Sequence, residues 1–177
     1  MEERGEAIVL IGFMGAGKSS IGRALAHRTG LPLYDTDELV ARRLGMPITD
    51  IFAQHGEAAF RDAETTELCG LQPQPAIVVT GGGIVLRSEN VNALRRLGVV
   101  VHLTADEATL FERATRRATR PLLQTENPRA RFAQLLQTRD ALYLGAADVT
   151  LDTSGLRRDE VVDSVLDELR KRDRHVA

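Results

Sequence analysis

Short apolar runs alternate with longer stretches of helical periodicity along the whole chain. The apolar runs predict five strands, at residues 7–11, 31–34, 76–80, 99–103 and 148–151. The stretches between them predict helices at residues 19–29, 38–44, 48–55, 57–71, 88–97, 105–117, 130–144 and 158–172. The runs are almost uniformly apolar, as expected of strands that are covered on both faces. Alternating strands and helices predict an α/β fold in which helices cover both faces of a parallel sheet.

Two segments interrupt this alternation. Residues 35–71 place several helical pieces between the second and third strands, with Gly56 separating two of them. Residues 113–128 form a loop rich in Arg, Pro and Asn. Insertions of this kind in an α/β core typically carry substrate binding or a lid. Ser88 is expected to cap the helix that follows the third strand.

Length and composition favour one cytoplasmic domain that is an enzyme or a binding protein. The chain has 177 residues and a net charge of −2, which argues against a nucleic-acid or membrane-surface partner. The acidic N-terminus does not resemble a signal peptide, and no apolar run approaches the roughly 18 residues that span a bilayer. A single cysteine, Cys69, excludes an intramolecular disulfide and a cysteine zinc site. The four histidines share no metal-ligand spacing.

The basic residues are strongly skewed toward arginine. Of 23 basic residues, only Lys18 and Lys171 are lysines. We attribute the skew mainly to genome composition, but it makes each lysine conspicuous. Lys171 lies in Leu-Arg-Lys-Arg-Asp, which does not match the Asn-Lys-x-Asp guanine motif, so GTP specificity of the usual kind is excluded.

Residues 12–19, Gly-Phe-Met-Gly-Ala-Gly-Lys-Ser, match the phosphate-binding pattern G-x-x-x-x-G-K-[ST] in full. The segment lies between an apolar strand and a helix, as the motif requires. Its glycines let backbone N–H groups approach phosphate oxygens, and the helix directs its positive end toward the same anion. A Walker-B acid is a weaker possibility at Asp106 and Glu107, which are better suited to starting a helix. The residues expected to bind the nucleotide here are Gly15, Ala16, Gly17, Lys18, Ser19 and Ser20.

Asp35-Thr36-Asp37 ends the second predicted strand. In extended chain, residues two apart point the same way, so the two carboxylates would meet at the carboxyl edge of the sheet. One interpretation gives Asp35 to a Mg²⁺ shell and makes Asp37 the acceptor of a hydroxyl proton. The other makes the pair solvated turn residues that cap the helix at Glu38, and the sequence alone does not choose between them.

Several arginines have two possible roles. Arg61 lies between Glu57 and Glu64 at helical spacing, which fits either a surface salt-bridge ladder or a carboxylate-binding guanidinium. Arg139 has the same ambiguity. Residues 113–131 contain six arginines and one acidic residue, which indicates a lid that closes on polyphosphate. RNA binding is the rival use, but few aromatic residues are nearby for base stacking.

Taken together, these motifs resemble shikimate kinase over roughly residues 7–168. The resemblance rests on the phosphate loop, Tyr-Asp-Thr-Asp, Ile-Phe-Ala-Gln-His-Gly-Glu-Ala-Ala-Phe-Arg-Asp-Ala-Glu, Thr-Gly-Gly-Gly, Thr-Arg-Pro-Leu-Leu and Arg-x-x-x-Tyr. It implies a P-loop three-layer fold whose five parallel strands have the order 2-3-1-4-5, with a substrate-binding subdomain at about residues 35–64 and a lid at about 113–128. The implied reaction is ATP-dependent phosphorylation of shikimate to shikimate 3-phosphate, in aromatic amino-acid biosynthesis.

The resemblance also implies roles for individual residues. Catalysis would involve Asp37, Lys18 and Arg120, and Mg²⁺ would be held by Ser19 and Asp35. Arg113 and Arg120 would contact ATP, and Arg157 is the nearest arginine to the adenine-contacting position near the fifth strand. The residues implied for shikimate are Asp37, Arg61, Gly81, Gly82, Gly83 and Arg139. The alternatives are a related small-molecule kinase, with gluconate as the substrate, or a nucleotide- or shikimate-sensing protein without turnover. A monomer is expected.

Overall fold

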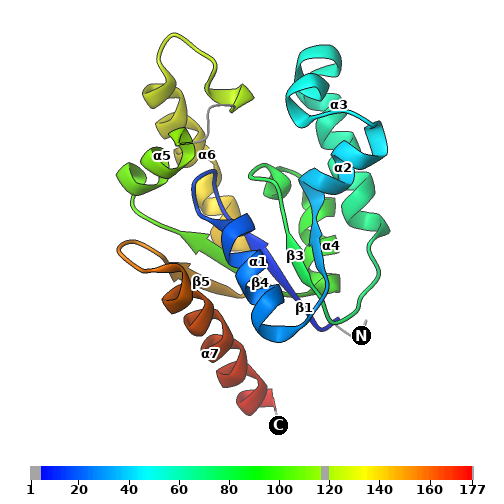
Figure 1. The fold of residues 1–177 in the computed structure, drawn as a ribbon, viewed down its shortest axis with the longest axis vertical. Coiled ribbons are helices and arrows are strands. Elements are labelled where there is room, and N and C mark those ends of the chain that lie inside the picture. The colour runs from blue at the N-terminus through cyan, green and yellow to red at the C-terminus, as the bar shows by residue number, and fades with distance from the viewer. Residues whose placement is uncertain (1–4, 117–119, 177) are drawn as a thin grey trace.

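The computed structural model describes residues 5–116 and 120–176 (Figure 1). Its sheet contains strands β1 (Ala7–Ile11), β2 (Leu33–Asp35), β3 (Ile77–Val79), β4 (Gly98–Thr104) and β5 (Val149–Asp152). All neighbouring strands are parallel, and their order is β2-β3-β1-β4-β5. The predicted fold class and strand order are therefore confirmed.

Helices cover both faces of this sheet. Helices α1 (Lys18–Thr29) and α7 (Arg158–Val176) pack together on one face, and α4 (Ser88–Leu97) and α6 (Pro128–Ala146) lie on the other (Figure 1). The central strand β1 is buried along its whole length, as the apolar runs predicted. Helix α1 lies so close to β3 that a Cβ at Gly22 would come within 2.3 Å of Val79 Cγ2.

Helices α2 (Thr36–Leu44) and α3 (Ile48–Gly70) form the first insertion and have a small core of their own, around Val40, Ile51 and Phe60. Helix α3 is broken at Gly56, whose φ of 80° and ψ of 172° are not helical. This break confirms the two separate helices predicted on either side of Gly56. In Figure 1, α2 and α3 rise at the same end of the sheet as α5 (Glu107–Thr115) and the start of α6.

Most of the second insertion is described. Residues 117–119, with the predicted lid residue Arg117, lie outside the described part of the chain. Helix α5 ends at Thr115, two residues before the predicted end, and the 3₁₀ turn η2 (Pro121–Leu123) follows. Asn127 then caps α6, because its Oδ1 accepts a hydrogen bond of 3.1 Å from the N–H of Ala130.

The caps correct two local predictions and settle a third. Helix α2 begins at Thr36 rather than at Glu38, because Asp35 Oδ1 accepts a 3.0 Å hydrogen bond from the N–H of Asp37. The cap predicted at Ser88 is wrong, since Ser88 is already the first residue of α4 and no side chain caps that helix. Asp106 caps α5 by accepting from the N–H of Thr109 at 2.8 Å. These acids therefore start a helix, and the Walker-B alternative is not supported.

One histidine is buried between the sheet and α6. His102 on β4 is only 2% exposed, and its ring stacks on Tyr143 of α6 with centroids 5.1 Å apart. Its Nδ1 has no hydrogen-bond partner among the described residues. Burial lowers the pKa of His102 to about 4, although the nearby Asp140 partly opposes this. The folded protein therefore keeps His102 neutral at pH values where the unfolded chain protonates it.

We therefore expect His102 to contribute to acid instability. Its stabilising effect is complete above the unfolded pKa of about 6.5 and is lost as the pH falls toward 4. A shift of this size lowers the free energy of unfolding by about 2 kcal/mol between pH 7.5 and pH 5. Urea unfolding of His102→Phe, which keeps a ring for stacking, should lack this component, whereas the exposed His55→Gln should retain it. Equal pH dependence in His102→Phe and the unmodified protein would contradict this assignment.

Candidate functional site

The phosphate loop joins the end of β1 to the start of α1. Gly15 has a φ of 86°, and a Cβ there would also meet the backbone oxygen of Leu110 at 2.1 Å, so glycine is required on both counts. Lys18 Nζ donates to the backbone oxygens of Gly12 at 2.7 Å and Phe13 at 3.2 Å. Helix α1 begins at Lys18, and its first N–H groups have no partner within the helix. The loop therefore presents donors and a positive charge to one anion.

A cavity of about 500 Å³ opens over this loop. Its lining includes most of the residues predicted to bind a nucleotide: Gly15, Gly17, Lys18, Ser19, Ser20, Arg113 and Arg120. Arg116 and Arg158 add further positive charge. A cavity of this size with several cations suits a ligand that carries more than one phosphate.

Two of the predicted nucleotide residues do not line the cavity. Ala16 is buried at 2% exposure. The side chain of Arg157 is 83% exposed and pairs with Glu160 at 3.4 Å, while the next residue, Arg158, faces the cavity. Arg113 lies near the end of β5, where it donates to the hydroxyl of Thr153 at 3.0 Å and to its backbone oxygen at 3.2 Å.

A second cavity of about 90 Å³ adjoins the first. Arg61, Arg139 and all three glycines of the 81–83 turn line it, together with the apolar side chains of Phe52 and Phe60. The two cavities share Met14, Asp37, Gly81, Gly82 and Arg120. The structure thus brings the predicted substrate residues together and places Asp37 and Arg120 where the two compartments meet.

The geometry predicted for the aspartate pair is wrong, although both residues lie at the site. Asp37 belongs to the first turn of α2 and not to an extended strand. Asp35 caps that helix and accepts from the hydroxyl of Ser19 at 3.4 Å. Asp37 is not a solvated turn residue, because its Oδ1 is buried and has no hydrogen-bond partner among the described residues. The two carboxylates therefore have different surroundings.

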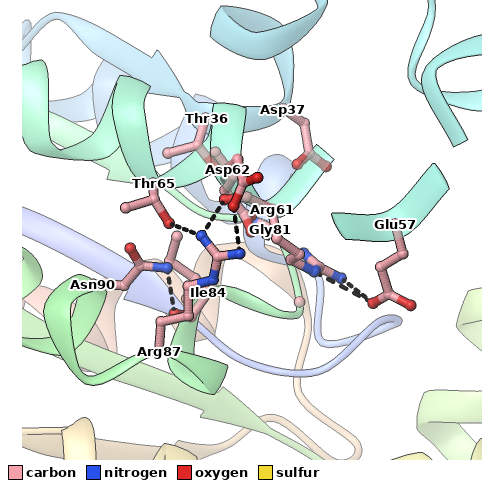
Figure 2. Close-up of polar contacts among 12 residues, drawn as sticks. Thr36, Asp37, Glu57, Arg61, Asp62, Thr65, Gly81, Ile84, Arg87 and Asn90 are labelled. Atoms are coloured by element: carbon pink, nitrogen blue, oxygen red, sulfur yellow. Dashed lines mark hydrogen bonds and ion pairs between the residues drawn. The ribbon is translucent and has the colours of Figure 1, made fainter. Parts of the chain in front are cut away.

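Arg61 is not part of a surface salt-bridge ladder, because it is only 8% exposed. Its Nη1 donates to Glu64 at 2.8 Å. Its Nη2 donates to Glu57 at 3.2 Å, as Figure 2 shows. Glu64 is fully buried, and its Oε1 has no hydrogen-bond partner among the described residues. A Cβ at Gly81 would come within 2.3 Å of this oxygen and 2.8 Å of Asp37 Oδ1. Two buried carboxylate oxygens therefore face the same glycine.

Burial perturbs the charges of this cluster. Desolvation raises the pKa of Asp37, and the neighbouring Glu64 raises it further, while Lys18 and Arg61 oppose the shift. Desolvation also raises the pKa of Glu64 and lowers the pKa of Lys18 to about 8. Groups with opposing shifts in one cleft are typical of sites that transfer protons or bind charged ligands.

Side chains from two helices hold the glycine turn. The N–H of Gly81 donates to Thr36 Oγ1 at 3.1 Å. The backbone oxygen of Gly82 accepts from the Tyr143 hydroxyl and from Arg139 Nη1 at 3.2 Å. A Cβ at Gly83 would lie 2.2 Å from Arg61 Cζ, so the guanidinium rests directly on this glycine. The turn and Arg61 therefore form one wall of the smaller cavity.

The sequence prediction missed several residues that build this site. The sequence predicts no role for Thr36, and it indicates Glu64 only as a helical neighbour of Arg61. Tyr143 was part of a motif without a role, although its position four residues after Arg139 places both on one face of α6. Arg158 was missed because Arg157 precedes it, and no spacing rule separates the two.

The site contains oxygen ligands that suit a divalent metal ion. No group of three His, Cys, Asp or Glu side chains that could hold a metal ion occurs within residues 5–116 and 120–176. Ser19 and Asp35 instead offer a neighbouring hydroxyl and carboxylate beside the phosphate loop. Oxygen ligands of this kind suit a hard divalent cation that takes its other ligands from phosphates and water.

None of the described helices is long and apolar enough to cross a membrane.

Comparison with known proteins gives a consistent result. The family model for shikimate kinase matches residues 14–170. Shikimate kinase from Thermodesulfovibrio yellowstonii is 44% identical over 162 residues, which cover 91% of this chain and 93% of that protein. The structure of shikimate kinase from Acinetobacter baumannii in complex with shikimate superposes with a TM-score of 0.86 and 33% identity, covering 97% of this chain and 96% of that one.

A gluconokinase from Sinorhizobium meliloti is a more distant neighbour. Its structure matches with a TM-score of 0.54 at 21% identity, over 98% of this chain and 97% of that one. Similarity at this level shows a shared fold and says nothing of the substrate.

The two lysines give a matched test of the phosphate loop. Lys18→Arg should lower the affinity for ADP at least about tenfold, because a planar guanidinium does not fit where a compact ammonium reaches two loop carbonyls. Lys171→Arg is the control, since Lys171 is exposed on α7 and pairs with Glu168 at 2.6 Å. Calorimetric titration with ADP measures both. An affinity of Lys18→Arg within about threefold of the unmodified protein would contradict the proposed fit.

Proposed function

Because this chain belongs to the shikimate kinase family and its activity is the ATP-dependent phosphorylation of shikimate, we propose that its two joined cavities hold the two substrates. ATP occupies the larger cavity and shikimate the smaller. The observation that carries this assignment is that Asp37, Arg120 and the glycines Gly81 and Gly82 line both cavities. The donor and acceptor of a phosphoryl group must meet at such a boundary.

In the larger cavity, the phosphates of ATP lie against residues 12–19 and Lys18 Nζ turns from the loop carbonyls toward them. Ser20 lines the same cavity beside the start of α1. Arg113, held at the end of β5 by Thr153, contacts the adenine. Arg158 is a better candidate for the second adenine contact than Arg157, because only Arg158 faces the cavity.

In the smaller cavity, Arg61 and Arg139 bind the carboxylate of shikimate. Both guanidiniums are largely buried, and both already contact the glycine turn or its acidic neighbours. A bidentate guanidinium matches a carboxylate better than any other side chain does. The N–H groups of Gly82 and Gly83 complete this wall, since neither carries a side chain that would fill the cavity.

Asp37 accepts the proton of the shikimate hydroxyl that attacks the γ-phosphorus, or orients that hydroxyl. Asp37 lines both cavities, and its Oδ1 has no hydrogen-bond partner within the described chain, which supports a hydrogen bond from a ligand hydroxyl. Burial raises its pKa, which makes it a better proton acceptor than an exposed aspartate. Lys18 and Arg120 neutralise charge on the transferred phosphoryl group, which is the main requirement of phosphoryl transfer.

The divalent cation that ATP-using kinases need is Mg²⁺ in this proposal. Ser19 donates its hydroxyl oxygen as a ligand, and Asp35 holds the ion or one of its waters, because the two groups are neighbours beside the loop. When bound, Mg²⁺ neutralises charge on the phosphates of ATP. Asp35 also anchors the N-terminus of α2, and this anchoring places Asp37 at the boundary between the cavities.

Parts of the chain are assigned by position. Residues 35–64 form the substrate-binding subdomain, which the separate small core of α2 and α3 supports. Residues 113–128 form the lid, since Arg113, Arg116 and Arg120 reach the larger cavity from this segment. Both cavities form within one chain, which supports a monomer. The use of ATP supports a cytoplasmic location.

The alternatives from the sequence are less well supported. A sensing protein without turnover would lack part of the catalytic set, whereas Lys18, Asp37 and Arg120 all line the larger cavity. Gluconate is also a carboxylate, but it is a flexible open chain, and a small cavity rimmed by buried arginines and a held glycine turn favours a rigid ring.

A coupled ADP-release assay tests the proposal. We expect ADP release with shikimate, and a kcat/KM at least about a hundredfold lower with gluconate or AMP. EDTA should abolish the activity, and added Mg²⁺ should restore it. Absence of shikimate-dependent ADP release would overturn the proposed function. Equal rates with gluconate would overturn the assignment of the smaller cavity to a rigid ring.

A further inference from the structure

Arg87 connects the segment after the glycine turn to α3, although it lines neither cavity. The glycine turn continues into the 3₁₀ turn η1 (Ile84–Leu86), and Arg87 follows at once. From there its side chain returns to α3, as Figure 2 shows. Its Nη1 donates to the backbone oxygen of Arg61 at 3.3 Å and to Thr65 Oγ1 at 3.1 Å. Its Nη2 donates to Asp62 Oδ1 at 2.6 Å.

Arg87 binds the backbone of Arg61, the residue proposed to bind the carboxylate of shikimate. The side chain of Arg61 lines the cavity and rests on Gly83, while its backbone oxygen receives the guanidinium of Arg87. Gly83 and Arg87 are only four residues apart in the sequence. The backbone of Arg61 is thus tied to the same short segment that its side chain contacts.

The segment around the turn is itself firmly held. Thr36 accepts from the N–H of Gly81, and Asn90 Nδ2 donates to the backbone oxygen of Ile84 at 3.0 Å (Figure 2). Asn90 is only 1% exposed. The backbone at Arg87 is therefore well held, and its planar guanidinium fixes the position of α3 relative to the glycine turn.

Helix α3 is broken close to Arg61. Arg61 lies five residues after Gly56, where the backbone leaves the helical conformation. Residues on both sides of the break pack with α2 in the small separate core, Ile51 before it and Phe60 after it. The apolar contact through Phe60 faces α2, whereas Arg87 ties the backbone of Arg61 to the segment that follows the glycine turn.

We infer that Arg87 is a positioning residue for shikimate, which sets the placement of Arg61 relative to the 81–83 turn. This inference rests on the proposed function. A purely structural role would rest on the ion pairs of Arg87, chiefly the one with Asp62, whose side chain is 72% exposed; the pair with Glu89 is longer, at 3.9 Å. Exposed pairs of this kind contribute little, so the two readings predict different results for substitutions at the two ends of the pair.

Three variants separate these readings. Arg87→Lys keeps the charge beside Asp62, but a single ammonium cannot reach three acceptors on α3 at once. We expect its KM for shikimate to rise about five- to tenfold, while its KM for ATP and its kcat stay within about twofold. Arg87→Gln, which also removes the charge, should show the same split. Asp62→Asn removes the shorter ion pair and leaves the hydrogen bonds of Arg87 to Arg61 and Thr65. It should change each constant by less than about twofold.

A double-mutant cycle with Arg61→Lys tests whether Arg87 acts through Arg61. The combined rise in KM for shikimate should be smaller than the product of the single effects. The inference would be overturned by a multiplicative effect in this cycle or by a similar result for Arg87→Lys and Asp62→Asn. It would also be overturned if the Arg87 variants raised both KM values equally and lowered the melting temperature. Absence of shikimate-dependent activity in the unmodified chain would instead reject the proposed function, so the two failures are distinguishable.

Discussion

The buried carboxylate oxygens of Asp37 and Glu64 impose the constraint on which the site depends. Both face Gly81, and neither has a hydrogen-bond partner among the described residues. Buried carboxylates are costly unless cations or ligands compensate them. Arg61 pairs with Glu64 through one oxygen, and Lys18 lies close enough to oppose the raised pKa of Asp37. Glu64 lines neither cavity, whereas Asp37 lines both, so in the proposed function the substrate hydroxyl compensates Asp37.

The order of the strands explains how these groups come together. The arrangement β2-β3-β1 places three carboxyl ends side by side. The phosphate loop follows β1, Asp37 follows β2, and the glycine turn follows β3. In a parallel sheet such ends share one edge, where ligands of α/β folds bind. Each of the three strands therefore positions a different part of the proposed site at this edge.

The fold and much of the site could be predicted from the sequence, because both depend on local patterns. Apolar runs predicted the sheet, and the phosphate loop and the Gly56 break follow from glycine chemistry at fixed positions. Contacts between distant segments could not be predicted. Glu64, Thr36 and Arg87 acquire their roles only when α2, α3 and the glycine turn meet. The aspartate pair was placed in extended chain because nothing in the sequence shows that Asp35 caps a helix starting at Thr36.

The most direct test of the account is the effect of Asp37→Asn on binding and on turnover. The amide has the shape of the carboxylate but cannot accept the proton of the attacking hydroxyl. We expect ADP affinity within about twofold of the unmodified protein and a kcat at least about a hundredfold lower with shikimate. A variant that keeps more than about a tenth of the kcat would contradict the role of Asp37 at the boundary between the two cavities.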